Sequence, residues 1–360
     1  MILGIETSCD DTACALIDGQ GIIRASVVSS QLAHQPYGGV VPEIASREHL
    51  KNWPAVSAAA FAQAEVSPAD LNAVAATRGP GLVGSLLVGQ SLGRAMAFAL
   101  DTPFYGVHHL EGHVVSPFLG GNVGDEPSPL PERFTALVVS GGHTSLLTVE
   151  GDRIESVAES RDDAIGEVFD KVGKRIGLAY PQGPRVDRLA ETGVADSSAF
   201  TVPPLSDDEL FFSYSGLKSQ ALRAIEKLER SGALAPDRAD PEGDDPEGEA
   251  LPQAARDLLA SFRHATVAQV IHRLNRSAQR IECLAVSGGV AANKLLRRRL
   301  IDWADEKSVD LRLVPLRWSG DNAAMIAFAA WLRRQRGEPS SPPEDLTVAS
   351  RIPFPSRSAL

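Results

Sequence analysis

The chain has 360 residues, of which 43% are hydrophobic, and a formal net charge of −11. This length and apolar content can bury a substantial core and favour a protein of two domains. The acidic balance argues against a protein that coats nucleic acid unaided, because phosphate binding depends on Lys and Arg. Three scattered cysteines without a C-x-x-C pair argue against a disulfide framework or a sulfur-ligated metal, and they fit a reducing compartment.

The apolar runs and the first residues predict neither export nor membrane insertion. The chain becomes acidic at Glu6 and has no basic region before it, so its start resembles a first strand rather than a signal peptide. The longest apolar run, residues 323–332, suits a buried helix and is too short to cross a membrane. We therefore expect a cytoplasmic protein that does not associate with a membrane.

Three strand-like runs within residues 2–28 predict a β-meander at the start of the chain. The bend between the first two runs, residues 6–12, carries hydroxyls and carboxylates, among them Asp10 and Asp11. Such a bend can hold a phosphate through backbone N–H groups while its carboxylates hold a cation or water. Taken alone, a solvated acidic turn is the simpler interpretation.

A strand expected at residues 71–77 leads into Gly79, Gly81 and Gly84 and then into a long helix. This G-x-G-x-x-G spacing also occurs in dinucleotide-binding folds, where the glycines cradle a pyrophosphate at a helix N-terminus. The proline inside the loop and the preceding meander disfavour that interpretation, because neither matches the βαβ start of such a fold.

His109 and His113 follow a short strand-like run at residues 103–107. If the segment is helical, both imidazoles lie on one face, where a single cation can take a nitrogen from each. Two histidines on a half-buried helix face explain the spacing equally well. Asp321 is the best candidate for a third ligand, although a carboxylate at such a position is more often a helix cap. Two histidines and a carboxylate, with open positions for water or substrate, form the donor set of catalytic Zn²⁺ or Fe²⁺.

The second half of the chain repeats features of the first. After a Gly- and Pro-rich stretch at residues 120–131, which is typical of a hinge, strands are expected at 134–139 and 145–149. A Ser-Gly-Gly turn at 140–142 joins them, and a second one, 287–289, follows a later strand. This weak repeat is consistent with two similar α/β halves. Two Gly-Gly turns facing one cleft suit a nucleotide phosphate and ribose, although each alone is more often just a tight turn.

Three further charged groups have an ordinary interpretation as solvated surface. Asp163, Glu167 and Asp170 fall at helical spacing and predict one acidic helix face. Lys218 lies in a polar-aromatic turn, where it could serve a phosphate or a nucleic-acid backbone. The densest basic cluster lies within residues 294–299.

Taken together and in order, these motifs resemble the tRNA N6-adenosine threonylcarbamoyltransferase family, bacterial branch, over nearly the whole chain. The resemblance is carried by residues 4–12, 36–43, 79–84, 109–113, 139–144, 169–171, 213–218, 286–293 and 321–325. It implies an α/β chain with the actin-like ATPase-domain fold, in which two ribonuclease-H-like lobes flank a central cleft. The expected parts are an N-terminal lobe of 1–116 plus 321–350, a C-terminal lobe of 133–320 with an acidic flexible insertion at 232–252, and a tail at 351–360.

The family transfers a threonylcarbamoyl group from threonylcarbamoyl-AMP to the N6 amine of the adenosine 3′ of the anticodon, in tRNAs that read codons beginning with A. The resemblance implies that His109, His113 and Asp321 bind one divalent metal per subunit, with Fe²⁺ expected and Zn²⁺ the alternative. The implied contacts to the adenylate are Val138, Val139, Ser140, Gly141, Gly142, Asp170, Gly183, Asp187 and Asn293. The expected partners are tRNA, a smaller paralogous subunit of the same fold and a P-loop ATPase subunit.

The chain departs from the family pattern at three places. Val138 stands where the archaeal and eukaryotic branch has a tyrosine ligand, which points to the bacterial branch and leaves a coordination position to substrate or water. Asp11 stands where Glu is usual, a change that keeps the charge. Gln182 stands where Gly is common and puts the local backbone in doubt, while Gly183 is retained.

The expected chemistry follows from these parts. The donor has a good leaving group, so the adenine amine needs positioning more than activation. A metal at the three ligands can bind donor oxygens, and N–H groups of the turn at 140–142 can add oxyanion-type stabilisation. Our hypothesis assigns acceptance of the amine proton to Asp10 or Asp11.

Two other classes of protein fit these residues less well. A metalloprotease is disfavoured because Glu111 falls between the two histidines in an order that neither zincins nor their inverted relatives have. A non-catalytic ATP-binding module, such as a chaperone of the same fold, does not need two histidines and an aspartate.

Overall fold

The computed structural model describes residues 1–202, 210–235, 250–277, 280–342, 345 and 347–352. Most of the predicted acidic insertion at 232–252 lies outside the described residues, as does the predicted tail beyond residue 352. Among the described residues, no helix combines the length and the apolar character that crossing a membrane requires.

The chain divides into two compact units. Unit 1 consists of Met1–Ala33, Val40–Glu132 and Val314–Leu360, and unit 2 consists of His34–Gly39 and Arg133–Leu313. Residues 314–320, which the sequence assigned to the C-terminal lobe, therefore belong to unit 1.

Unit 1 is built on a five-stranded sheet with the strand order β3-β2-β1-β4-β5. The strands are β1 (Ile2–Glu6), β2 (Asp11–Ile17), β3 (Ile23–Ser30), β4 (Ala73–Gly79) and β5 (Phe104–His108). The first three form the predicted antiparallel meander, and β4 and β5 extend the sheet in parallel to β1. The helices are α1 (Pro42–Ala64), α2 (Val83–Ala99), α3 (His109–Val115) and α9 (Ala323–Gln335).

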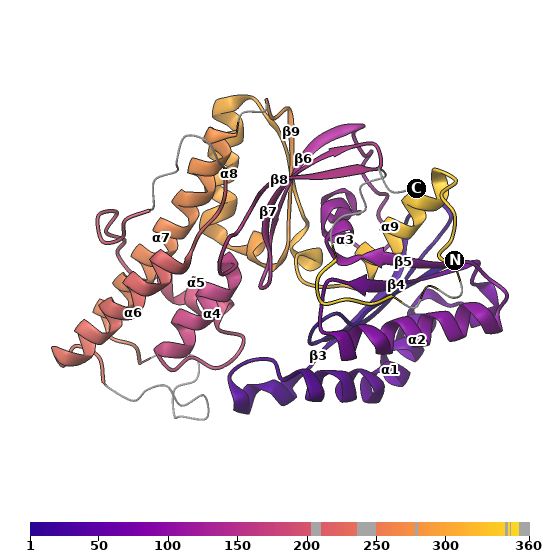
Figure 1. Ribbon diagram of the computed structural model, residues 1–360, viewed down its shortest axis with the longest axis horizontal. Coiled ribbons are helices and arrows are strands. Elements are labelled where there is room, and N and C mark those ends of the chain that lie inside the picture. Colours follow the sequence, from indigo (N-terminus) through magenta and orange to yellow (C-terminus); the bar gives the residue numbers. More distant parts are fainter. Residues whose placement is uncertain (203–209, 236–249, 278–279, 343–344, 346, 353–360) are drawn as a thin grey trace. The chain divides into compact units, whose positions relative to one another are not determined.

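Alternation along β1 explains how the helices cover this sheet. Leu3 and Ile5 belong to the apolar core that the sheet shares with Trp53 and Val56 of α1. Gly4 points to the opposite face, where α9 packs against β1 so closely that a Cβ at Gly4 would overlap the carbonyl oxygen of Ala323. Helices α1 and α2 thus cover one face of the sheet and α9 covers the other (Figure 1).

Unit 2 has a second five-stranded sheet with the order β10-β9-β6-β7-β8. Its strands are β6 (Arg133–Val139), β7 (Thr144–Glu150), β8 (Arg153–Glu159), β9 (Cys283–Ser287) and β10 (Asp310–Leu313). An antiparallel meander is again followed by two parallel strands, so the two sheets share one topology and the predicted repeat is confirmed. The helices are α4 (Ile165–Arg175), α5 (Gln182–Ala190), α6 (Ser215–Arg230), α7 (Gln253–Arg276) and α8 (Lys294–Lys307).

The Gly- and Pro-rich stretch at 120–131, predicted as a hinge, is fastened to unit 1. The carbonyl of Gly120 accepts a hydrogen bond from the indole of Trp318 at 2.8 Å, and the N–H of Gly124 donates to Ile23 at 2.8 Å. The boundary between the two units falls after this stretch, at Arg133.

The prediction of one acidic helix face is wrong for Asp163. Helix α4 begins at Ile165, so Asp163 precedes it, and its carboxylate pairs with Lys171 and Lys218 instead. Lys218, considered for a phosphate contact, is therefore engaged within the protein.

The contact between β1 and α9 generates a stability prediction. We expect Gly4→Ala to lower the free energy of unfolding of unit 1 by about 1–3 kcal/mol, because the added methyl group has to displace the backbone of α9. Gly19→Ala is the matched control, since a Cβ there meets nothing within 4 Å. Thermal unfolding of both variants is the measurement, and equal melting temperatures would contradict the packing described.

Candidate functional site

The two predicted histidines lie at the start of a short helix. β5 ends at His108 and α3 begins at His109, so His109 and His113 lie one helical turn apart on the same face. Both side chains are buried, and their ring centroids are 4.7 Å apart with an angle of 86° between the ring planes. The helical spacing predicted for the pair is thus present.

Asp321 meets both imidazoles. Its Oδ1 lies 3.2 Å from Nε2 of His113 and 3.6 Å from Nε2 of His109, and one ligand atom from each residue lies within 4.8 Å of the others. Asp321 does not cap α9, because Asn322 occupies the N-cap and its side chain accepts from the N–H of Met325. The alternative interpretation of Asp321 as a helix cap is therefore wrong.

Glu6 stands behind His109. Its Oε2 lies 3.0 Å from Nδ1 of His109 and accepts a 2.7 Å hydrogen bond from the Thr77 hydroxyl, and its Oε1 accepts from the N–H of Ser8 at 2.5 Å. The Glu6 side chain is fully buried at the end of β1. Burial is the largest influence and alone would raise its pKa, but the charge and hydrogen bond of His109, together with the hydrogen bond of Thr77, outweigh burial, so the pKa of Glu6 lies below its usual value.

The two carboxylates control the protonation of His109. Burial disfavours the charged imidazole and alone would lower its pKa, but Asp321 and Glu6 outweigh burial and raise the pKa of His109 to about 9. Without a cation, the His109 ring is therefore protonated on both nitrogens and positively charged near neutral pH. A metal that binds Nε2 has to replace the proton on that nitrogen.

The donor atoms fit a divalent metal. Because Nδ1 of His109 can donate to Glu6, its Nε2 lone pair is directed toward Asp321, the usual arrangement of a histidine ligand with an outer carboxylate. Nδ1 of His113 is buried without a hydrogen-bond partner among the described residues. The nitrogen of His113 that faces Asp321, and so the one placed to bind a metal, is Nε2.

Two contacts hold α3 against α9. The guanidinium of Arg333 in α9 binds both carboxylate oxygens of Glu111, with Nε at 2.8 Å from Oε1, and it also donates to the carbonyl of Gly106 at 3.1 Å. Gly112 permits the close approach, because a Cβ there would lie 2.9 Å from Cγ of Met325. Glu111 therefore fixes the ligand helix and is not a catalytic base, which removes the metalloprotease interpretation.

The glycine loop before α2 serves the bend between β1 and β2. A Cβ at Gly81 would lie 2.6 Å from the carbonyl oxygen of Ser8, and the N–H of Leu82 donates to that oxygen at 2.8 Å. The glycines thus make room for the protein's own backbone, and the dinucleotide interpretation of the G-x-G-x-x-G spacing is wrong.

Asp10 and Asp11 lie on this bend. Burial raises the pKa of Asp11 to about 7, and the negative charge of Asp321 adds to the rise. A hydrogen bond from Ser30 acts in the opposite direction and lowers the pKa, but its effect is smaller than that of burial. Asp11 is therefore not the solvated carboxylate of an ordinary surface turn. Its position in the electrostatic field of Asp321 links the bend to the two-histidine site.

The predicted substrate contacts all lie in unit 2. β6 and β9 pair in parallel with Val138 opposite Ser287, so both Ser-Gly-Gly turns leave the same end of the sheet. Gly288 has a φ of +92° and packs directly against the carbonyl of Val139. The side chains of Val138 and Val139 are buried in the sheet, so these two residues can offer a ligand only their backbone.

The first of these turns has an open surface. The N–H of Ser140 donates to the carbonyl of His143 at 2.8 Å, so it is not free to bind an oxyanion as predicted. Gly141 and Gly142 are exposed, their N–H groups have no partner among the described residues, and a Cβ at either position meets nothing within 4 Å. A ligand can approach these two backbone groups closely.

Two of the predicted substrate residues are carboxylates on helices, Asp170 in α4 and Asp187 in α5. Oδ1 of Asp170 in α4 accepts from the N–H of Gly183 in α5 at 2.7 Å, so Gln182 does not prevent this contact. Oδ1 of Asp187 accepts from Asn293 at 2.7 Å and from Arg263 at 2.9 Å. The predicted substrate residues thus form hydrogen-bonded pairs that join α4 to α5 and α5 to the start of α8.

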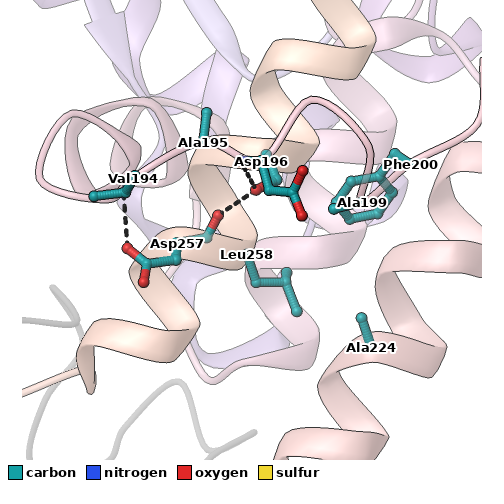
Figure 2. A pocket seen from close by; sticks show the side chains of 9 residues that line it. Val194, Ala195, Asp196, Ala199, Phe200, Ala224, Asp257 and Leu258 are labelled. Carbon is teal, nitrogen blue, oxygen red and sulfur yellow. Dashed lines mark hydrogen bonds between the residues drawn. The ribbon is translucent and has the colours of Figure 1, made fainter.

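A separate pocket of about 360 Å³ lies elsewhere in unit 2 (Figure 2). It is lined mainly by apolar side chains and also by Asp196, Asp257 and Ser261, and Asp257 accepts a hydrogen bond from the N–H of Val194 at 2.7 Å. None of the predicted site residues lines it.

Sequence reasoning missed two residues of the site in unit 1. Glu6 was read only as part of an acidic bend, and its position at the end of a buried strand was the available signal. Arg333 follows the apolar run of α9 and looks like an ordinary charge in the last turn of a helix. Only the packing of α3 on α9 reveals its bond to Glu111.

Comparisons with known proteins identify the family of the chain. The family model for tRNA N6-adenosine threonylcarbamoyltransferase matches residues 22–328. The chain is 44% identical to the protein of that name from one strain of Thermus thermophilus over 95% of both chains. It is also 44% identical to the one from Pelobacter propionicus, over 97% of this chain and 96% of the relative.

Solved structures establish the fold. A crystal structure of full-length HypF in a phosphate- and nucleotide-bound form aligns with a TM-score of 0.56 and 15% identity, over 93% of this chain and 46% of HypF. The chain has the actin-like ATPase-domain fold expected from the sequence. The family match and the relatives make it a transferase. The chain belongs to the tRNA N6-adenosine threonylcarbamoyltransferase family.

Proposed function

We propose that this chain transfers the threonylcarbamoyl group of threonylcarbamoyl-AMP to the N6 amine of the adenosine 3′ of the anticodon in tRNAs that read codons beginning with A. In this reaction a bond forms between N6 and the carbamoyl carbon, the bond from that carbon to the phosphate oxygen breaks, and AMP leaves while N6 loses a proton. The observation that carries the proposal is the convergence of His109, His113 and Asp321 in a chain that matches the family over most of its length.

We assign His109, His113 and Asp321 as the ligands of a divalent metal, Fe²⁺ by preference and Zn²⁺ as the alternative. Two imidazoles and one carboxylate suit either ion and leave positions open to donor oxygens. When bound, the metal supplies Lewis-acid stabilisation of negative charge on the donor. Glu6 sets the tautomer of His109, and Glu111 with Arg333 holds the helix that carries both histidines.

In the same proposal, unit 2 binds the adenylate. The exposed N–H groups of Gly141 and Gly142 are suited to phosphate or carbonyl oxygens of the donor. Asp170 and Asp187 carry acceptors suited to ribose hydroxyls, and Asn293 keeps Asp187 in place. Val138 and Val139 contribute through their backbone.

We assign acceptance of the N6 proton to the pair Asp10 and Asp11. A pKa of about 7 places Asp11 where a general base is effective at neutral pH. A cation bound by Asp321 would favour the ionised carboxylate and keep Asp11 ready to accept a proton.

We further propose that the chain works with tRNA, a smaller paralogous subunit and a P-loop ATPase subunit. The net charge of −11 supports sharing tRNA binding with other chains. Exposed apolar side chains on the packed helices α1 and α2, among them Leu50, Leu87 and Phe98, support a protein partner.

The metal assignment predicts the behaviour of a ligand variant. His113→Ala should lose the bound metal and almost all transfer, because two donors remain where three are needed. His264→Ala, which removes a partly exposed histidine of α7, is the control and should keep both. Metal content of the purified chain and modified adenosine in unmodified tRNA supplied with threonylcarbamoyl-AMP, both read by mass spectrometry, are the measurements. Full transfer by a metal-free variant would contradict the assignment.

The donor-binding assignment predicts a steric effect. Gly142→Val should fold normally, since its side chain meets open space, but it should lower the affinity for AMP at least about tenfold. The loss of one hydrogen bond to a charged group alone corresponds to about 1.5–3 kcal/mol. Gly19→Val, at an open position of unit 1, is the control. Calorimetric titration with AMP is the measurement, and unchanged affinity would remove Gly142 from the site.

A further inference from the structure

The bend that carries Asp10 and Asp11 is held through three consecutive backbone carbonyls. Each accepts a hydrogen bond from a different part of unit 1. The donors are the N–H of Leu82 to Ser8 at 2.8 Å, Nε2 of His49 to Cys9 at 3.0 Å, and the N–H of Gln31 to Asp10 at 3.0 Å. His49 is the only one of these three donors that is a side chain, so it is the only one that a substitution can remove.

The surroundings of His49 specify one protonation state. A carbonyl can only accept, so the contact with Cys9 requires a proton on Nε2. Nδ1 lies 3.2 Å from the side-chain amide of Gln31, which also donates to the carbonyl of Ala45 at 3.1 Å, and 2.8 Å from the hydroxyl of Thr12. Because an amide nitrogen can only donate, Nδ1 is the acceptor. His49 is therefore a neutral imidazole protonated on Nε2.

The position of His49 makes this grip rigid. The side chain is fully buried, and it projects from α1, which packs against both β2 and β3. Thr12 belongs to β2 and follows Asp11 directly, while Gln31 follows the end of β3. The His49 ring thus connects α1 to β2, which begins at Asp11, and to the residue that follows β3.

We propose that His49 is a positioning residue for the transfer reaction. Its hydrogen bond to the Cys9 carbonyl keeps Asp10 and Asp11 in the position in which one of them can accept the N6 proton. This inference rests on the proposed function, in which that pair accepts the N6 proton. His49 does not touch the reacting atoms and acts only through the bend. A displacement of about 1 Å at a reacting group can lower a rate about a hundredfold, so the hold on one carbonyl has a measurable effect.

Two substitutions separate the two sides of the ring. His49→Gln retains an amide N–H that can reach the Cys9 carbonyl and loses the Nδ1 acceptor, whereas His49→Asn retains an acceptor near Nδ1 and loses the donor to Cys9. Both are made in the full chain loaded with metal. The single-turnover transfer rate, the KM for threonylcarbamoyl-AMP, metal content and melting temperature are measured, with threonylcarbamoyl-AMP and unmodified tRNA as substrates.

We expect His49→Asn to lower the transfer rate about ten- to hundredfold, with metal content and KM close to those of the unchanged chain. His49→Gln should recover most of the rate. Combined with whichever of Asp10→Asn and Asp11→Asn slows transfer, His49→Asn should add little, because both changes act through one group. Three outcomes would each overturn the proposal. They are equal losses of transfer rate in His49→Gln and His49→Asn, an unchanged rate in His49→Asn, and a double variant in which the losses of His49→Asn and of the aspartate substitution multiply in full.

A readout without turnover separates this inference from the proposed function. If the unchanged chain makes no modified adenosine, or if both aspartate variants keep the full rate, the proposed function or its proton acceptor is wrong. The hold on the bend is then decided by ¹⁵N NMR of the His49 ring. Two results together support the hold on the bend. The His49 ring of the unchanged chain is neutral and protonated on Nε2, and the backbone amides of the bend exchange faster in His49→Asn than in the unchanged chain. A ring that is charged or protonated on Nδ1 overturns it.

Discussion

The contact of His109 with two carboxylates is the interaction on which the rest of the site depends. Glu6 ends a buried strand, His109 begins a helix and Asp321 precedes another, so three elements meet at one imidazole. Several packing features of unit 1 allow these three elements to come together. Gly4 lets α9 lie close to β1, Gly112 lets α3 lie close to α9, and the ion pair of Glu111 with Arg333 fixes α3 in place.

Electrostatics explains why such a cluster persists in a buried place. An ionised carboxylate as deeply buried as Glu6 is costly unless an opposite charge compensates it. In the metal-free chain the protonated ring of His109 provides that charge, and its pKa near 9 expresses the same coupling. A divalent cation can take over this compensation while the imidazole returns to its neutral form. The site is therefore arranged before a ligand arrives, and proton release accompanies its filling.

Much of this arrangement could be predicted from the sequence, and the failures have physical causes. The meanders, the helical histidine pair and the Ser-Gly-Gly turns rest on local periodicity and turn chemistry, which short segments determine. Asp321 lies more than 200 residues from His113, so spacing could propose it but could not separate a ligand from a cap. Glu6, Arg333 and His49 act through contacts made only after packing. The family resemblance supplied the substrate and the expected metal, which no local pattern specifies.

The most direct test of the central interaction is the pH dependence of metal affinity. If a metal has to displace the proton of His109, the apparent affinity for Zn²⁺, measured by competition with a chelator, should rise about tenfold per pH unit between about pH 7 and 8.5. Glu6→Gln removes one of the two charges that raise the pKa of His109 and should flatten this dependence. Equal affinity across this range in the unchanged chain, or a slope that Glu6→Gln leaves intact, would contradict the account.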